Sequence, residues 1–179
     1  MKTYISILRG INVSGQKLIK MADLRLMFES LNLCNVRTYI QSGNVIFETS
    51  QAECRELAKT ISAAILKTFG FEVPVIVLEQ ETLTAISEHN SFVNNRGVDI
   101  ATLHVTFLSG EPQGSLKETI DPDGYLPDEF YIEGPAVYLH CPNGYGNTKL
   151  NNNFFEKKLK LQATTRNWRT LLELVKLSS

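Results

Sequence analysis

The order in which hydrophobic periodicity changes over the first 80 or so residues is the feature that most constrains how this chain can fold. Thr3–Leu8 alternates and is rich in β-branched residues, which is typical of a strand. From Met21 onward, apolar residues recur at the spacing of one helix face. Two further strands are predicted over Val36–Ile40 and Asn44–Glu48, around the glycine-bearing turn Gln41-Ser42-Gly43.

A second helix and a fourth strand complete this pattern. Ser50, followed three residues later by Glu53, has the form of a capping box that opens a helix, and Gly70 is suited to end it. Val73–Leu78 then has the composition of a strand. The order β-α-β-β-α-β is that of the ferredoxin-like fold, in which the four strands lie in the order 4-1-3-2.

The second half of the chain begins in the same way. A strand is predicted over Ile100–Leu108, a short helix over 112–120, and a hairpin from Glu129–Glu133 and Ala136–Cys141. Helices are predicted to begin at about Lys149 and at about Arg166. We therefore expect an α+β protein of two tandem ferredoxin-like (βαββαβ-type) subdomains with antiparallel sheets and C-terminal helices. The expected domains are residues 1–95 and residues 96–179, the second ending in two helices.

The two predicted hairpins are also alike in sequence. Tyr39–Phe47 can be written above Tyr131–Leu139, which places Val45 over Val137. This likeness favours a tandem duplication, although hairpins of such composition also arise by chance.

The composition excludes several classes of protein. A chain of 179 residues with 43% hydrophobic and 21% charged residues is that of an ordinary globular protein. We find no secretory signal and no apolar run near the roughly 20 residues of a membrane helix. The three cysteines, Cys34, Cys54 and Cys141, are far apart, which argues for a reducing compartment. We expect a cytoplasmic protein with no membrane partner; the oligomeric state stays open.

Charge is distributed unevenly along the chain. Residues 1–47 carry six basic and two acidic side chains, and residues 149–179 carry seven and two, whereas residues 48–148 carry five and fifteen. The two ends therefore have net charges of +4 and +5, and the middle has −10. Basic ends that share one face would favour an anionic ligand, but the ends could equally neutralise the middle.

The predicted topology brings two polar turns together. Strands 1 and 3 of a ferredoxin-like sheet are antiparallel neighbours, so Arg9–Asn12 should lie beside Ser42-Gly43-Asn44. The start of the first helix returns to the same edge with Lys17 and Lys20. Backbone N–H groups of glycine turns and of a helix N-terminus are anion donors. The alternative is that the asparagine and serine side chains only hydrogen-bond the turn backbone.

We favour the binding of an anionic ligand, either nucleic acid or a phosphorylated small molecule, at a rim formed by the 9–20 and 41–44 turns. The candidate ligand-binding residues are Arg9, Asn12, Lys17, Ser42, Asn44, Lys149 and Arg166. One alternative is a small-molecule enzyme with a site between the two subdomains, with His104 and His140 as nominees for acid–base work. Another is a purely structural interaction protein. The molecular function itself stays unknown, no catalytic residue is predicted, and whether the protein is an enzyme stays open.

Other motifs carry no chemistry. Gly10–Gly15 has the glycine spacing of a phosphate-binding Walker loop, but Gln16-Lys17-Leu18 stands where Lys-Ser/Thr is needed. The octamer typical of an RNA-recognition motif is absent. His104, His140 and Cys141 lack the short spacing of metal ligands, so neither a metal nor a cofactor is predicted.

Several segments resemble a bacterial family catalogued as domain of unknown function 1697. They are Leu8–Val13, Met21 with Leu24-Arg25, Thr38–Phe47, His104–Leu108, Thr148–Leu150, Phe155–Lys157 and Thr165–Trp168. The family pattern commonly has glycine where Ser14 stands and serine where Thr148 stands. The resemblance implies two ferredoxin-like subdomains in a small cytosolic protein. It brings no established activity, and therefore no catalytic residues.

Overall fold

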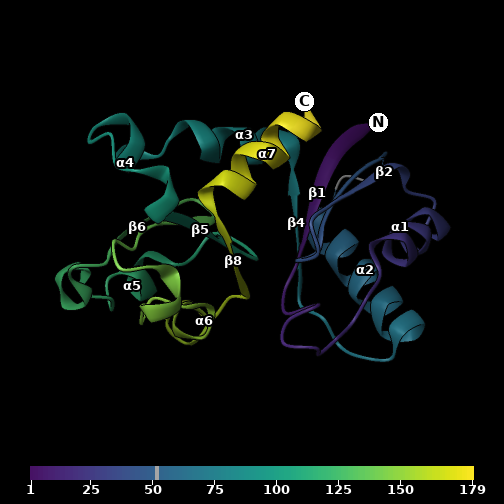
Figure 1. Ribbon diagram of the computed structural model, residues 1–179, viewed down its shortest axis with the longest axis horizontal. Helices are drawn as coiled ribbons and strands as arrows, with labels where there is room; N and C mark the ends of the chain where they lie inside the picture. Colours follow the sequence, from purple (N-terminus) through teal and green to yellow (C-terminus); the bar gives the residue numbers. More distant parts are fainter. Residues whose placement is uncertain (51–52) are drawn as a thin grey trace. The chain divides into compact units, whose positions relative to one another are not determined.

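The computed structural model describes residues 1–50 and 53–179 (Figure 1). The chain forms two compact units, one made of Met1–Thr84 with Leu174–Ser179 and the other of Ala85–Glu173. The predicted division between residues 95 and 96 concerns folding domains and stays a prediction. Each unit is described by itself.

The first unit contains a four-stranded antiparallel sheet. Its elements are β1 (Lys2–Leu8), α1 (Met21–Ser30), β2 (Cys34–Tyr39), β3 (Asn44–Thr49), α2 (Cys54–Phe69), β4 (Val75–Glu79) and the start of α3 (Gln80–Glu88). The strands lie in the order β2-β3-β1-β4, which is the 4-1-3-2 order of the ferredoxin-like fold. The fold predicted for the first half of the chain is confirmed.

The core of the first unit lies between the sheet and its two helices. Successive side chains of a strand point to opposite faces, so Tyr4 and Leu8 of β1 share one face with Phe47 of β3. Helices α1 and α2 cover that face (Figure 1). The rings of Tyr4 and Phe47 stack with centroids 5.8 Å apart, and Phe28 of α1 meets Phe47 at 5.7 Å. Burial of each such side chain contributes about 1.5–3 kcal/mol.

The second unit has the same strand topology. Its strands are β5 (Leu103–Leu108), β6 (Glu129–Glu133), β7 (Ala136–His140) and β8 (Ala163–Asn167), in the antiparallel order β6-β7-β5-β8. Its helices are the end of α3, α4 (Ser91–Asn94), η1 (Ile100–Thr102), α5 (Gly114–Lys117), η2 (Pro122–Tyr125), η3 (Tyr145–Asn147), α6 (Asn152–Leu159) and the first part of α7 (Trp168–Ser178). Two ferredoxin-like sheets in tandem are therefore confirmed.

The two helices predicted near the end of the chain are present, but each begins two or three residues later than expected. Arg166 does not open a helix, because it lies in β8, which pairs with β5 and is followed by α7 from Trp168. The helix expected at about Lys149 begins at Asn152, after Asn151 accepts a hydrogen bond from the Phe154 N–H at 3.0 Å. The second unit thus completes its own βαββαβ pattern.

The two units match in backbone hydrogen bonding at the end of their first strands. In the first unit, the N–H of Leu8 donates to the Gly43 carbonyl at 2.9 Å, and in the second the N–H of Leu108 donates to the Pro135 carbonyl at 2.8 Å. The next backbone N–H groups, those of Arg9 and Ser109, donate to the carbonyls of Pro74 and Gln162. These two residues directly precede β4 and β8, the last strands of the two sheets. Leu8 and Leu108 are therefore equivalent positions.

The equivalence corrects the hairpin alignment drawn from the sequence. Asn44 matches Ala136 as expected, since each pairs with the same position of its first strand. Across the hairpins, however, Tyr39 pairs with Asn44, whereas Glu133 pairs with Ala136. Tyr39 therefore corresponds to Glu133 and not to Tyr131, because the first hairpin loop is two residues longer.

Candidate functional site

The loop of residues 9–20, between β1 and α1, has an unusual backbone. Five of its residues have left-handed φ values: Gly10 (76°), Asn12 (55°), Ser14 (51°), Gly15 (73°) and Lys17 (47°). Residues other than glycine rarely adopt this conformation, because their Cβ approaches the backbone too closely. The loop therefore holds its shape through specific contacts.

Asn12 fixes the loop to the hairpin between β2 and β3. Its side-chain N–H groups donate to the Ile19 carbonyl at 3.0 Å and to the Gln41 carbonyl at 2.8 Å. Its side-chain oxygen accepts from the Ile19 N–H at 2.8 Å. Both ends of the Asn12 amide are thus used inside the protein. The bond from Asn12 to Gln41 therefore holds together the two turns that were predicted to converge.

The hairpin loop of residues 40–43 is fixed from the other side. Gly43 has a φ of +86°, and a Cβ there would lie 2.7 Å from Ile11 Cδ1 and 2.8 Å from Leu8 Cβ. Asn44 is fully buried and donates to the Tyr39 carbonyl at 3.0 Å and to the Ser42 hydroxyl at 3.1 Å. Ser42 and Asn44 therefore support the hairpin, and a contact of either with a ligand stays a prediction.

Lys17 and Arg9 connect the loop to a third segment, residues 70–74. The ammonium group of Lys17 donates to the Glu72 carbonyl at 2.7 Å, and the backbone N–H of Arg9 donates to the Pro74 carbonyl at 3.1 Å. We call residues 9–20, 40–43 and 70–74 together the first-unit rim. Five of the seven candidate residues belong to this unit and lie on or beside the rim.

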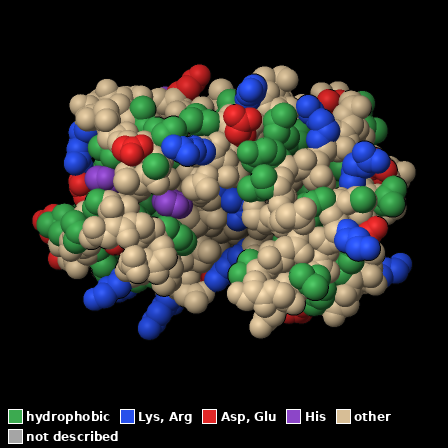
Figure 2. All heavy atoms as spheres, in the orientation of Figure 1, with side chains coloured by type: hydrophobic (Ala, Val, Ile, Leu, Met, Phe, Trp, Pro, Cys, Tyr) green, Lys and Arg blue, Asp and Glu red, His purple; other side chains and the backbone are tan. Residues whose placement is uncertain are grey.

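A hollow of about 410 Å³ opens at this rim, between the start of α1 and the end of α2. It is lined by Asn12, Leu18, Ile19, Lys20, Asp23, Gln41 and Phe69. Its volume lies in the range of small-molecule sites, roughly 300–1,000 Å³. In Figure 2, Lys and Arg side chains stand among hydrophobic ones over the surface of α1 and α2.

Three polar side chains of the hollow are available to a ligand, whereas the Asn12 amide is already bonded. Within residues 1–50 and 53–179, no hydrogen bond or ion pair holds the side chains of Lys20, Asp23 or Gln41. Lys20 also stands at the N-cap of α1 without a side-chain cap. The sequence had placed Lys20 near the rim, but nothing in it pointed to Asp23 or Phe69.

Lys149 and Arg166 belong to the second unit. Lys149 is exposed and precedes α6. Arg166 is 9% exposed, and one of its guanidinium N–H groups donates to the Thr165 carbonyl at 3.0 Å. Burial lowers the pKa of Arg166 to about 10, so the side chain stays charged at neutral pH.

The two histidines nominated for acid–base chemistry lie on opposite faces of the second sheet. His104 pairs with Leu139, and Leu103 pairs with His140, and paired residues share a face. His104 stacks on Tyr145 with ring centroids 4.9 Å apart, and burial lowers its pKa. His140 Nδ1 lies 3.3 Å from a Glu129 oxygen. The two imidazoles therefore cannot act as one acid–base pair.

In the described ranges, no three His, Cys, Asp or Glu side chains gather closely enough to hold a metal ion. Cys141 is buried, which raises its pKa to about 11. None of the helices within the described ranges has the length and apolar character needed to span a bilayer.

The fold defines a class, a tandem ferredoxin-like α+β protein whose first unit carries an enlarged loop rim. A solved structure of a conserved bacterial protein from Streptococcus pneumoniae has this fold, with a TM-score of 0.77, 22% identity, and 99% of both chains covered. The chain belongs to the family described as protein of unknown function DUF1697, which matches residues 1–138. A comparison with curated proteins found no match.

Proposed function

We propose that the first unit binds an anionic, phosphate-bearing ligand at the first-unit rim, with the ligand seated in the 410 Å³ hollow. The observation that carries the proposal is a comparison inside the molecule. The two units share strand order and register, so the second unit indicates what the scaffold needs at this corner.

The first unit has much more chain at the rim than the scaffold requires. Twelve residues, 9–20, connect β1 to α1, whereas five residues, 109–113, connect β5 to α5. Four residues, 40–43, close the first hairpin, whereas two residues, 134–135, close the second. The two enlarged loops bond to each other through Asn12. Loops longer than about 12–15 residues are uncommon in compact domains and are often functional, and the 9–20 loop is at the lower end of that range.

Backbone strain supports the same proposal. Lys17 has a φ of 47° and Ile40, a β-branched residue, has a φ of 51°. Holding such residues in the left-handed region costs on the order of 1–3 kcal/mol each. Strain of this kind persists where the surrounding structure imposes it, and it clusters at ligand sites. The 9–20 loop has three left-handed residues other than glycine (Asn12, Ser14 and Lys17), and the 40–43 loop has Ile40.

The charge of the rim favours an anion. Arg9, Lys17 and Lys20 lie on the loop, and the last of these lines the hollow. The positive end of the α1 dipole adds to the local potential. An ammonium group that hydrogen-bonds a phosphate oxygen strengthens binding by about 1.5–3 kcal/mol.

The test is the affinity of the full chain for ribose 5-phosphate, measured by calorimetry at low salt for the wild type and for Lys20→Ala. We expect Lys20→Ala to weaken binding about tenfold, in line with the loss of one charged hydrogen bond. Lys59→Ala is the matched control, because Lys59 is exposed on α2 and pairs with Glu56 at 2.8 Å. Equal affinities for the two variants, or no binding by the wild type, would overturn the proposal.

A further inference from the structure

The hollow at the first-unit rim is lined by two side chains of opposite charge that do not form an ion pair with each other. Lys20 and Asp23 are three residues apart at the start of α1 and both line the hollow. Pairs at that spacing commonly meet, as Glu56 and Lys59 do at 2.8 Å. Within the described part of the chain, Lys20 and Asp23 form no ion pair with each other or with another residue.

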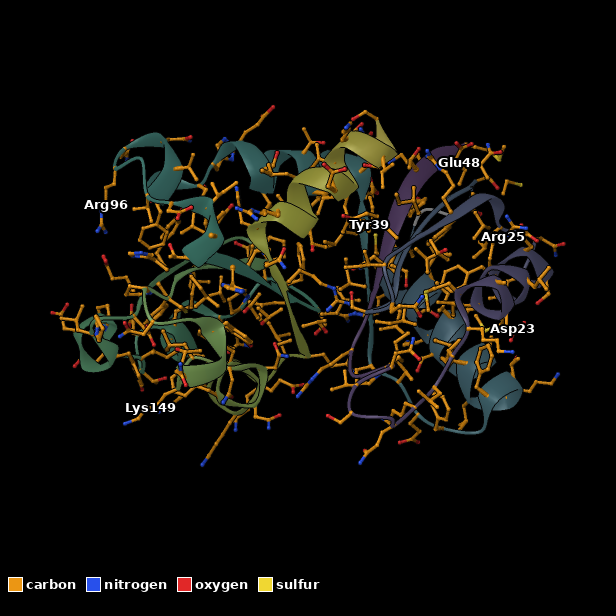
Figure 3. The ribbon with its side chains drawn as sticks, viewed as in Figure 1. Asp23, Arg25, Tyr39, Glu48, Arg96 and Lys149 are labelled. Atoms are coloured by element: carbon orange, nitrogen blue, oxygen red, sulfur yellow. The ribbon has the colours of Figure 1, made fainter. Side chains whose placement is uncertain are left out.

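The direction of the Asp23 side chain agrees with this position. Figure 3 shows Asp23 and Arg25 on different sides of α1. Arg25 pairs with Glu29 at 3.4 Å along the outer surface of the helix. Asp23 instead shares the hollow with Phe69, the last residue of α2. Asp23 therefore lies on the wall of the hollow, on a different side of α1 from Arg25.

A free carboxylate restricts which anions can enter. A bare phosphate would be attracted by Lys20 and repelled by Asp23, since both charges line one hollow. A ligand that is favoured by both groups must carry its anion at one end and hydrogen-bond donors at the other. A carboxylate accepts hydrogen bonds at both of its oxygens, so two adjacent N–H donors suit it best.

The remaining walls of the hollow suit a flat ring. Leu18 is 68% exposed, and Phe69 is half-buried with its ring stacked on Phe71 at a centroid distance of 6.4 Å. Aromatic side chains such as Phe69 are surfaces on which nucleobases stack. The free Gln41 amide adds a donor and an acceptor at the edge.

We infer that the hollow takes a nucleotide whose base carries adjacent N–H donors, as guanine does, and that Asp23 is the residue that selects it. Lys20 holds the phosphate, Phe69 and Leu18 flank the ring, and Asp23 accepts from the ring N–H and the amino group. The inference rests on the proposed function and names the ligand class of the same site. The inference covers both a free nucleotide and a nucleotide within a single strand, because the recognised chemistry is the same.

The experiment measures the affinity of the full chain for GMP, IMP, ribose 5-phosphate and phosphoethanolamine, in the wild type and in Asp23→Asn. IMP has the ring N–H of GMP but lacks its amino group, ribose 5-phosphate lacks the base, and phosphoethanolamine carries an ammonium group in place of the sugar. For the wild type we expect GMP to bind at least tenfold more tightly than ribose 5-phosphate, with IMP between them.

The two ligands should respond to Asp23→Asn in opposite directions. GMP should bind about tenfold more weakly, because the carboxylate acceptor is lost, whereas ribose 5-phosphate should bind more tightly, because a like charge is removed. Damage to the fold would weaken both, so the signs separate selection from a structural effect. Asp23→Glu should restore part of the GMP preference. Glu29→Gln, an exposed acid on the same helix, is the matched control and should change neither affinity.

The failures are distinguishable. Lys20-dependent binding of ribose 5-phosphate with no preference for GMP, or with no effect of Asp23→Asn, would overturn the inference and leave the proposed function standing. Preferred binding of phosphoethanolamine would also overturn it, since Asp23 would then select a cation. Absence of any Lys20-dependent binding would overturn both.

A guanine-rich oligonucleotide that binds more tightly than GMP, with a steep salt dependence, would assign the nucleotide to a strand, and equal affinity would assign it to the free pool.

Discussion

At the scale of single residues, Gly43 is a point where the hairpin backbone packs tightly against Ile11 of the 9–20 loop and Leu8 of β1. Its φ of +86° favours glycine, and the space where a Cβ would stand is already filled by Leu8 and Ile11. The backbone conformation and the packing therefore act at one position. This makes Gly43 the residue that most directly holds the shape of the rim.

We predict that Gly43→Ala destabilises the protein by about 2–4 kcal/mol, combining an unfavourable backbone conformation with overpacking. Urea unfolding of the full chain measures this. Gly134→Ala is the control, because Gly134 has a φ of +55° in the second hairpin but no atom within 4 Å of an added Cβ. It should cost about 1 kcal/mol from the backbone alone. Equal losses for the two variants would contradict the close packing at Gly43.

The sequence predicted where the polar residues of the rim lie better than it predicted what their side chains do. The sequence indicated that Asn12, Ser42 and Asn44 lie at converging turns, and the structure brings Asn12 to Gln41 at 2.8 Å. It could not indicate how many hydrogen bonds each amide makes internally, because those bonds depend on three-dimensional loop geometry. Asn12 uses both ends of its amide in this way, so we expect it to position the loops.

At the scale of elements, β8 was missed because its signal is weak. Ala163–Asn167 is five residues long and polar, and its apolar neighbours continue into the strongly periodic α7. Thr164 and Thr165 are β-branched, which favours a strand. Asn167 ends the strand, and its side chain caps α7 by accepting from the Thr170 N–H at 2.8 Å. An asparagine before a periodic stretch is a helix-start signal that could have moved the boundary.

The start of α2 shows a second limit of sequence patterns. Ser50 and Glu53 fit a capping box, but the helix begins at Cys54 with Glu53 at the N-cap and no side-chain cap. The prediction of Ser50 as the cap was wrong. A serine three residues before a glutamate is common in sequences, and only the local backbone decides whether that serine caps a helix.

Glu129 connects β6 to the segment that follows α4. One of its oxygens accepts from Arg96 at 2.6 Å, and the other lies 3.3 Å from His140 Nδ1. The hydrogen bond from Arg96, helped by His140, lowers the pKa of Glu129 below its ordinary value of 4.5. Arg96 also lies over the Phe92 ring at 5.7 Å.

This lowered pKa predicts a pH dependence of stability. A carboxylate whose pKa is lower in the folded state stabilises the fold above its unfolded pKa, and the stabilisation is lost as the pH falls through the folded value. We therefore expect Glu129→Gln to lower the free energy of unfolding at pH 6 and to change it less at pH 3. Urea unfolding of both proteins at the two pH values measures this. A pH-independent difference would show that the ionised carboxylate contributes nothing.

At the scale of the whole molecule, the duplication is what makes the rim interpretable. At the end of the first strand, the first copy of the topology has a twelve-residue connection, whereas the second copy has five residues. The duplication was predictable from strand and helix order. The two-residue difference in the hairpin loops was not predictable. The sequence favours an alignment of Tyr39 with Tyr131, whereas the strand pairing aligns Tyr39 with Glu133.

The hollow could not be predicted from sequence. It forms where the start of α1 meets the end of α2, two segments more than 40 residues apart in the chain. Phe69 reads in the sequence as one more residue on the core face of a helix, and Asp23 as an ordinary acidic residue of a first turn. Only their meeting beside Lys20 and Gln41 gives them a shared surface.

The most direct test of ligand binding at the first-unit rim is an NMR titration of the full chain with ribose 5-phosphate, followed through the backbone amide resonances. We predict that the perturbed amides concentrate in residues 9–23 and 40–43 and around Phe69, and that the amides of β6 and β7 in the second unit, which carry the short hairpin, do not shift. Perturbations centred on the second unit, or none at saturating ligand, would contradict the account.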